Sequence, residues 1–239
     1  MGEIILIASG KGGVGKTVFT ANLGAELAQR GASVVLIDMN IGLRSLDICL
    51  GLENRVIYDL TDAITGTCKI KQALIKDRRF PELYLISAPQ IRNKYEISSD
   101  EMKAFCRELK ELYDYILIDA PAGVDDGLLL AAAPADRAVI VTVPEYAAIR
   151  DAELLDGVLK EIGIYNKCVV VNKIMANLYQ KGLVPDPADI AESLRLPMTG
   201  LIQYDQNIHI SANIGIPIVT AKGSYIQQNF SNIADRIIS

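Results

Sequence analysis

Tryptophan is absent from the sequence, histidine occurs once, and basic residues are outnumbered by acidic ones. Lysine and arginine together number 24, against 29 aspartates and glutamates, so the 239 residues carry a formal net charge of -5. Without a cationic surplus the chain has no general field to hold a polyanion, and we expect no nucleic acid partner. It also lacks an uncharged apolar run of about 18 residues and a basic leader, so we expect a cytoplasmic protein.

Cysteine is scarce and widely spaced, at Cys49, Cys68, Cys106 and Cys168. No two of these form a C-x-x-C pair, and the lone histidine, His209, is not near them in the sequence. Such spacing is not that of a zinc site or an iron–sulfur cluster. We expect reduced thiols in the core, and for His209 a structural place on an amphipathic helix.

Short β-branched and leucine-rich runs recur between helical patterns. They lie at residues 4–8, 33–38, 83–87, 115–119, 138–143, 168–172 and 199–203. Several are apolar throughout, as strands buried on both faces should be. The pattern predicts an α/β fold, with a doubly wound, mostly parallel sheet and helices on both faces. No long linker or internal repeat divides the chain, so we expect residues 1–239 to form a single domain.

The ends of three helices can be placed from local signals. We expect helices at residues 17–30 before Gly31, at 98–112 with a capping box of Ser98 and Glu101, and at 147–162 before Gly163. The stretch at 176–197 contains three prolines and is the least regular part of the chain.

A glycine-rich segment, SGKGGVGKTVFTAN, follows the first expected strand and opens the first expected helix. It matches G-x-x-x-x-G-K-[ST], the phosphate-binding P-loop, whose backbone N–H groups and helix N-terminus surround a phosphate. The candidate nucleotide-binding residues are Gly10, Lys11, Gly12, Gly13, Val14, Gly15, Lys16, Thr17 and Val18. Lys16 is expected to bridge the β- and γ-phosphates, and the Thr17 hydroxyl to ligate Mg²⁺. The motif itself gives no role to the second lysine, Lys11.

Two further strands end in an aspartate. The segment ILIDAPAG places Asp119 at the carboxyl edge of the sheet, where a Walker B carboxylate reaches Mg²⁺. The segment VVLID places Asp38 at a similar position. Asp38 is the weaker metal candidate, because an aspartate after a strand often only caps the following turn.

Five segments together resemble the MinD family of septum-site ATPases: KGGVGKT, VLIDMNIGLRSLDICLGLENRVIYDL, QALIKDRR, YILIDAPAG and VPEYAAIRDAELLDG. This family lies within the deviant Walker A group, together with ParA, nitrogenase iron protein and Mrp-type scaffolds. The match is dense from Ile4 to about Gly157 and looser beyond. The resemblance implies that ATP and Mg²⁺ are the cofactors and that two ATP-bound subunits form a homodimer. In that dimer Lys11 would reach the partner's phosphates and act as a catalytic cation, much as an arginine finger does.

The resemblance assigns further positions. The residues after Asp38 resemble switch I, and DAPAGVDDG resembles switch II. Asn172 lies where the family contacts adenine, and Asp205 lies in a second loop that lines the base. Gln203, in a position where relatives often have proline, leaves the fine geometry of the adenine contact open. Pro144, Glu145, Arg150 and Asp151 resemble the family segment that contributes to the dimer and partner surface, although a solvated helix start explains them equally well.

Asn40 departs from the family pattern. Switch I usually reads Asp-x-Asp-x-Gly, and its second aspartate helps to place and activate the attacking water. Here the sequence is DMNIG, and an amide carbonyl accepts a hydrogen bond from water but cannot take its proton. Because phosphoryl transfer depends mainly on positioning and charge stabilisation, we expect Asn40 to slow turnover without abolishing it.

The final segment also departs from the family, in which a basic amphipathic helix attaches to the membrane. Here Ile226, Phe230, Ile233 and Ile237 form a helical stripe, but the opposite face offers a single cation, Arg236. We expect this helix to pack on the core. Two alternatives stay open: a relative without an anchor, or a protein that attaches at the inner face of the cell membrane through a segment absent from this chain.

The leading functional hypothesis is a positioning switch in division-site selection. Mg·ATP would drive dimerisation, protein regulators of the MinC/MinE type would recognise the dimer, and hydrolysis would dissolve it. A second hypothesis keeps the dimer but treats it as a hydrolysis-impaired scaffold, and a third is a flagellar positioning regulator of the FlhG kind. DNA partitioning of the ParA kind is disfavoured by the negative charge.

Overall fold

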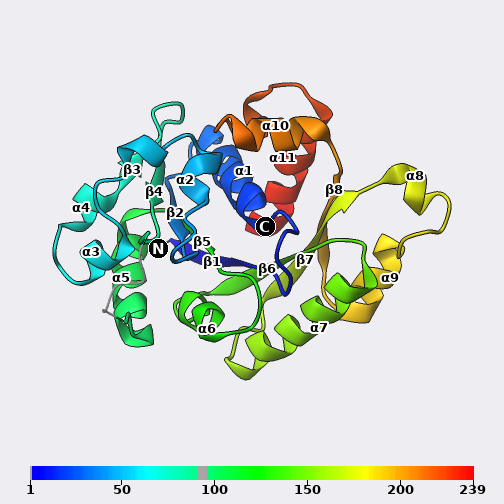
Figure 1. Cartoon of the computed structure of the whole chain (residues 1–239), viewed down its shortest axis with the longest axis horizontal. Coiled ribbons are helices and arrows are strands. Elements are labelled where there is room, and N and C mark those ends of the chain that lie inside the picture. Colours follow the sequence, from blue (N-terminus) through cyan, green and yellow to red (C-terminus); the bar gives the residue numbers. More distant parts are fainter. Residues whose placement is uncertain (1, 91–95) are drawn as a thin grey trace.

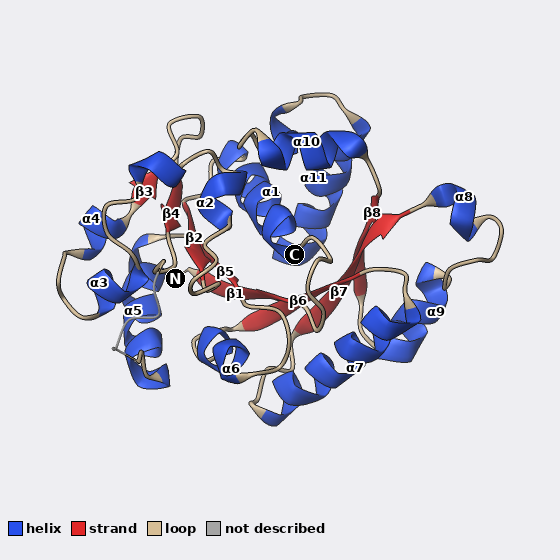
Figure 2. Ribbon diagram, in the orientation of Figure 1, coloured by secondary structure: helices blue, strands red, loops and turns tan. Residues whose placement is uncertain are grey.

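The fold is an eight-stranded, mostly parallel sheet covered by helices on both faces (Figures 1 and 2). The computed structural model describes residues 2–90 and 96–239. The strands are β1 (Glu3–Ala8), β2 (Val34–Asp38), β3 (Ile75–Lys76), β4 (Leu83–Ile86), β5 (Tyr115–Asp119), β6 (Arg137–Thr142), β7 (Lys167–Ile174) and β8 (Met198–Gln203). They lie in the order β3-β4-β2-β5-β1-β6-β7-β8, and within this sheet only the β3–β4 pair is antiparallel. The predicted α/β fold is therefore confirmed.

Helices of very different length connect the strands. They are α1 (Lys16–Gln29), α2 (Leu46–Cys49), α3 (Leu60–Ile64), α4 (Ile70–Ala73), α5 (Ser99–Leu112), α6 (Asp126–Ala132), α7 (Tyr146–Glu161), α8 (Ala176–Tyr179), α9 (Pro187–Leu194), α10 (Gln206–Asn213) and α11 (Tyr225–Ile238). Figure 2 shows α1, α10 and α11 over one face of the sheet and α5, α6 and α7 over the other. Among the described residues, no helix is both long enough and apolar enough to span a bilayer.

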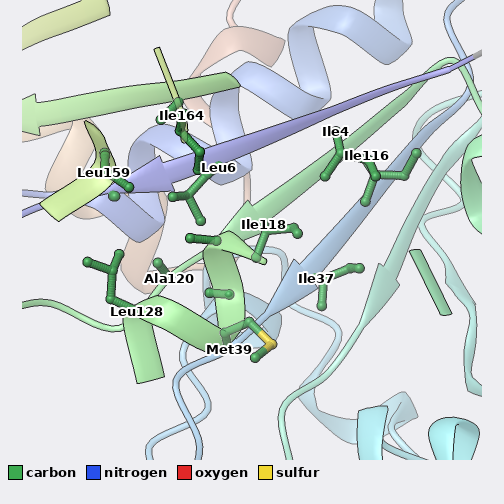
Figure 3. Packing of buried hydrophobic residues seen from close by; sticks show 14 of the residues in the cluster. Ile4, Leu6, Ile37, Met39, Ile116, Ile118, Ala120, Leu128, Leu159 and Ile164 are labelled. Carbon is green, nitrogen blue, oxygen red and sulfur yellow. The ribbon is translucent and has the colours of Figure 1, made fainter. Parts of the chain in front are cut away.

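The sheet separates two hydrophobic cores because its strands alternate their side chains between faces. In β1, Ile4, Leu6 and Ala8 pack with the residues of α5, α6 and α7 in one cluster. Ile5 and Ile7 point to the other face and pack with α1 and α11. Figure 3 shows the first cluster, in which β1, β2 and β5 present branched side chains to the helices. Burial on both faces explains why the central strands read as continuous apolar runs.

The chain begins in the middle of the sheet, and this position creates a crevice. After β1 the chain passes to α1 on one face, while after the adjacent β6 it passes to α7 on the opposite face. Loops that leave neighbouring parallel strands in opposite directions open a crevice at the carboxyl edge, where α/β folds bind ligands. The glycine-rich loop lies at this edge, between β1 and α1.

The local helix signals agree with the structure. Gly31 and Gly163 follow α1 and α7 with φ of 94° and 89°, the left-handed conformation that glycine adopts without strain. The predicted capping box of α5 is present, with Ser98 Oγ accepting from the Glu101 amide at 3.3 Å. The proline-rich stretch at 176–197 contains the short helices α8 and α9.

The last helix, α11, packs on the core as expected. Ile226, Phe230, Ile233 and Ile237 are all buried, and the Phe230 ring lies 6.0 Å from that of Phe19 in α1. The helix therefore covers the same face of the sheet as α1, and its apolar stripe is part of the second core.

The cysteines are free, but only two of the four are fully buried. Cys68 and Cys106 lie in the core, while Cys49 and Cys168 are half-buried. Burial raises the pKa of the Cys106 thiol to about 12, and burial followed by nearby carboxylates raises that of Cys49 to about 12. Both thiols are thus held in the protonated form at neutral pH.

Candidate nucleotide and magnesium site

The glycine-rich loop connects β1 to α1 and has two glycines in the left-handed region, which favours glycine. Gly13 and Gly15 have φ of 79° and 93°, and Gly15 caps α1 in the left-handed conformation. A Cβ added to Gly10 would lie 2.3 Å from the Asp151 carbonyl oxygen, and one added to Gly15 would lie 2.4 Å from Asn172 Nδ2. The loop is therefore packed against α7 on one side and against β7 on the other.

A cavity of about 830 Å³ opens above this loop at the carboxyl edge of the sheet. Its lining comes from four parts of the chain: the loop with the start of α1, the residues after β2, the residues after β5, and the ends of β7 and β8 with α10. The lining residues are Ser9, Gly12, Gly13, Val14, Gly15, Lys16, Thr17, Val18, Asn40, Ile41, Leu43, Pro121, Ala122, Asn172, Lys173, Gln203, Tyr204, Asp205, Ile208 and His209. Of the predicted site residues, Gly10, Lys11, Asp38 and Asp119 lie outside this lining.

Asp119 lies beneath the site, behind the lining residues Lys16 and Thr17. It is buried and accepts hydrogen bonds from Lys16 Nζ at 2.9 Å and from Thr17 Oγ1 at 2.7 Å. Thr20, one turn further along α1, adds a bond to the same carboxylate at 3.2 Å. Burial raises the pKa of Asp119, and the Lys16 ammonium opposes this effect. The two predicted halves of the site, the loop lysine and the strand-ending aspartate, thus meet directly.

Asn40 joins the two strand-ending aspartates. Its Nδ2 donates to Asp38 Oδ1 and to Asp119 Oδ2, each at 2.8 Å, and its backbone N–H also donates to Asp38 Oδ1. Only a donor group fits between two carboxylates without repulsion, and an amide supplies two N–H groups. An aspartate at this position would bring a third negative group to the same place.

The oxygen atoms at and around Asp119 are suitable ligands for a magnesium ion. The Thr17 hydroxyl and the carboxylates of Asp38 and Asp119 are hard oxygen ligands of the kind that Mg²⁺ prefers. The described residues contain no group of three or more histidine, cysteine or acidic side chains able to enclose a metal. A site with few protein ligands suits Mg²⁺, which keeps waters and binds phosphate oxygens in nucleotide sites.

Lys11 and Lys16 lie in different surroundings. Lys16 is buried on Asp119, whereas Lys11 Nζ contacts Glu145 Oε2 at 2.7 Å, with their side chains 40% and 59% exposed. The hydrogen bond that Lys11 donates to the Glu145 carboxylate raises the pKa of Lys11. Lys11 therefore carries a full positive charge on the surface, outside the cavity of its own chain.

The far side of the cavity is formed by β7 and α10. Asn172 Nδ2 donates to the Val14 carbonyl oxygen at 2.8 Å, and its Oδ1 accepts from the Lys173 amide. Asp205 caps α10 by accepting from the Asn207 amide at 2.7 Å. A hydrogen bond from the Tyr225 hydroxyl lowers the pKa of Asp205. Both predicted base-side residues thus lie in the cavity wall and are held by local hydrogen bonds.

Several residues of the site had no sequence signal. Lys173 lies in the left-handed region, with φ of 57°, and its Nζ donates to the Gly13 carbonyl oxygen at 2.6 Å. In the sequence, only its position directly after Asn172 indicates that Lys173 lies at the site. His209, expected to be structural, is instead exposed on α10 and lines the cavity. Tyr204 also lines the cavity, and no local sequence pattern predicts this position.

A parallel sheet with a glycine-rich loop at its carboxyl edge, a loop lysine and a strand-ending aspartate defines a P-loop NTPase. A family model labelled ParA, described as NUBPL iron-transfer P-loop NTPase, matches residues 1–238. The septum site-determining protein MinD of Thermotoga maritima is 43% identical over 239 residues, covering 99% of this chain and 88% of the relative. The Bacillus subtilis MinD is 43% identical over 240 residues, covering 100% and 90%. The chain belongs to the MinD family of ATPases.

Solved structures agree with this assignment. The MinC:MinD cell division protein complex of Aquifex aeolicus superposes with a TM-score of 0.92 at 39% identity, covering 99% of this chain and 96% of that one. The Pyrococcus horikoshii MinD complexed with Mg-ADP gives a TM-score of 0.89 at 28% identity, covering 99% and 96%. As a member of this family the chain is an ATPase, and ATP and Mg²⁺ are its cofactors.

Proposed function

We propose that this ATPase is a positioning switch that forms a homodimer when ATP binds and serves in division-site selection. The observation that carries the proposal is the separation of the two loop lysines. Lys16 lies on Asp119 inside the cavity, while Lys11 lies outside it, exposed and fully charged. A cation outside the cavity of its own chain is available to the nucleotide of a second subunit that faces it.

The site residues divide the work of hydrolysis. The loop amides and Lys16 bind the β- and γ-phosphates, and Thr17, Asp38 and Asp119 would hold Mg²⁺. When bound, Mg²⁺ neutralises charge on the phosphate oxygens. Lys11 of the partner subunit would then stabilise the charge that develops on the transferred phosphoryl group. Before that step Lys11 must leave Glu145, which holds it in the single chain.

Asn40 sets the rate in this proposal. Its amide donates to both Asp38 and Asp119, so its side chain is oriented by the metal-site carboxylates. It positions water through its carbonyl oxygen but has no basic group to accept a proton. We expect slow turnover and a long-lived ATP-bound dimer.

A hydrolysis-impaired scaffold is the second candidate, and the amide of Asn40 is the observation that favours it. In that case the ATP-bound dimer would be the working state and turnover would serve only as a slow timer. Turnover that responds to a partner protein supports the switch, and turnover that no partner changes supports the scaffold.

The partners of the dimer are expected to be proteins. The Aquifex relative is found in a complex of MinC with MinD, which supports a regulator of the MinC type for this chain. The net charge of -5 gives no reason to expect nucleic acid. We place the protein in the cytoplasm, where it would meet such regulators.

Mixing two inactive variants tests whether Lys11 acts across the interface. Lys11→Ala removes the cation given to the partner, and Lys16→Gln removes the lysine that serves the subunit's own nucleotide. In a mixed dimer, the site of the Lys11→Ala subunit has its own Lys16 and receives Lys11 from the other subunit. We expect the equimolar mixture to recover up to about a quarter of the wild-type activity, because about half of the dimers are mixed and each mixed dimer has one complete site, although each variant alone is at least about 10²-fold slower.

Calorimetry on each variant, at the ATP concentration of the assay, first establishes that both still bind nucleotide. With nucleotide binding shown, and with the mixed dimer shown by light scattering, a mixture no faster than its separate components would mean that Lys11 serves its own subunit. That result would remove the basis of the proposal.

A further inference from the structure

The segment QALIKDRR matches the family but lies outside the nucleotide cavity, and Arg79 at its end makes an unusual set of contacts. Its Nε donates to Asp77 Oδ1 at 2.9 Å and its Nη2 to Asp77 Oδ2 at 2.6 Å. The Asp77 side chain is 2% exposed. A bidentate pair with a buried carboxylate fixes the plane of the guanidinium group.

The fixed guanidinium bonds two segments that are far apart in the sequence. Its Nη2 donates to the carbonyl oxygen of Leu50 at 2.5 Å, at the end of α2. Its Nη1 donates to the carbonyl oxygen of Gly215 at 2.7 Å, just after α10. One side chain therefore connects the ends of α2 and α10.

The other end of α2 is bonded to the metal side of the site. The backbone N–H groups of Ser45 and Leu46 both donate to Asp38 Oδ2 at 3.0 Å. Asp38 in turn accepts from Asn40, which lines the cavity. The short helix α2 thus extends from the phosphate side of the cavity to Arg79.

The other end of α10 lies on the base side of the cavity. Ile208 and His209, in the first turns of α10, line that wall. Beyond the helix, Gly215 meets Gly51 so closely that a Cβ on Gly215 would lie 2.6 Å from the Gly51 nitrogen. Backbones packed this tightly do not move independently, because packed interiors transmit displacement.

We propose that Arg79 is a positioning residue that couples occupation of the base side of the cavity to the order of switch I. The path runs from α10 through Gly215 and the Arg79 guanidinium to Leu50, along α2, and on to Asp38. The inference rests on the ATP site and deepens the proposed function by naming how the site is regulated. It assigns a role to a segment that does not line the cavity.

The coupling has a defined thermodynamic meaning. A ligand that fills the base side must change the stability of α2, although α2 itself does not line the cavity. A contiguous chain of hydrogen bonds makes such coupling possible, but only a measured difference between two ligands demonstrates it. The ligands must therefore differ in the base and share the phosphate side.

Hydrogen exchange with Mg·ADP and with Mg·pyrophosphate provides that comparison. Both ligands, at saturation established by calorimetry, occupy the phosphate side, and only ADP carries a base. In the wild type we expect the amides of residues 45–51 to exchange at least about fivefold more slowly with ADP than with pyrophosphate. Neither ligand carries a γ-phosphate, so the test does not depend on the proposed dimer, whose failure would appear in mass measurements instead.

Three variants decide the role of Arg79. In Arg79→Ala and Arg79→Lys the difference between ADP and pyrophosphate at residues 45–51 should disappear. A lysine keeps the charge beside Asp77, but its single nitrogen cannot reproduce a planar fork that bonds two carbonyls and a carboxylate. The matched control is Arg78→Ala, which removes an adjacent exposed arginine and should leave the difference intact.

Loss of stability alone would raise exchange with both ligands and leave their ratio unchanged, so the ratio separates coupling from a merely structural role. If Arg79→Ala does not fold, Arg79→Lys carries the test. An equal exchange rate with both ligands in the wild type overturns the proposal. So does a difference that persists unchanged in either Arg79 variant.

Discussion

At the scale of single residues, Asn40 is the side chain that joins the two strand-ending aspartates. Its amide donates to both carboxylates, to Asp38 Oδ1 and to Asp119 Oδ2. A carboxylate at the same place would repel both of them and would leave their oxygens without these donors. The amide thus orders the two carboxylates, but it lacks the basic group that an aspartate would supply.

The Asn40→Asp variant should therefore hydrolyse ATP faster and be less stable without metal. With a saturating regulator, we expect its turnover to exceed that of the wild type, because a carboxylate can take a proton from the attacking water. In a chelator we expect its free energy of unfolding to fall by about 1–3 kcal/mol, and Mg²⁺ to restore part of this loss. Steady-state ATPase assays and urea unfolding, each with and without Mg²⁺, measure the two effects.

Asn40→Ala is the matched control, since it removes the donors but adds no charge. Its stability should fall, and Mg²⁺ should restore less of it than in Asn40→Asp. A wild type that turns over at least as fast as Asn40→Asp would contradict the catalytic part of this account. Equal free energies of unfolding for the wild type and Asn40→Asp in chelator would contradict the structural role of the Asn40 amide.

At the scale of secondary-structure elements, α5 shows how far local sequence signals determine structure. Ser98 Oγ accepts from the Glu101 amide, and the Glu101 side chain accepts from the Ser98 amide at 2.9 Å. This reciprocal pair satisfies two amides that have no partner inside the helix. The box was readable because both partners lie three residues apart in sequence.

Replacing the cap should weaken α5 by a known amount. We expect Ser98→Ala to lower the free energy of unfolding by about 1 kcal/mol, because one helix amide loses its acceptor. Urea denaturation monitored by circular dichroism gives the value. Ser98→Asp, which keeps an acceptor at the cap, should stay close to the wild type, and an alanine variant of equal stability would show that the cap contributes nothing.

The elements that sequence reasoning missed are those without a repeating pattern. The strand β3 has two residues, and α2 and α4 have four each, which is too short for a helical or strand period to appear. Their positions depend on tertiary contacts such as the bonds from Arg79 to Leu50 and Gly215. The seven longer strands could be predicted because each contains a run of β-branched residues or leucine, and the central strands are buried on both faces.

In the nucleotide site, too, some residues have a local sequence pattern and others are positioned only by tertiary contacts. The glycine-rich loop and Asp119 were recognisable because each has a fixed spacing within one segment. Lys173, Tyr204 and His209 reach the cavity only after β7, β8 and α10 have packed against the loop. Their contribution therefore depends on the three-dimensional arrangement and not on a local motif.

At the scale of the whole molecule, the last described helix, α11, packs with α1 in one hydrophobic core. Phe230 is 1% exposed and lies against Phe19. Phe230→Ala should lower the free energy of unfolding by about 3–5 kcal/mol, because it removes a buried ring and leaves a cavity. Thermal and urea unfolding measure the loss.

Tyr165→Ala is the control, since Tyr165 is 75% exposed and its truncation opens no cavity. That variant should remain within about 0.5 kcal/mol of the wild type. A loss in Phe230→Ala as small as that in Tyr165→Ala would mean that α11 does not belong to the cooperative core.

The whole-molecule claim is that ATP, and not ADP, assembles two chains so that Lys11 of each reaches the other's nucleotide. Gel filtration with light scattering, on wild type and Lys11→Ala in Mg·ATP, Mg·ADP and no nucleotide, tests it most directly. The account predicts a mass near twice that of the 26.0 kDa chain only for the wild type in ATP, and a single-chain mass in every other case. A monomer in all three states, or a dimer that persists unchanged in ADP, would contradict it.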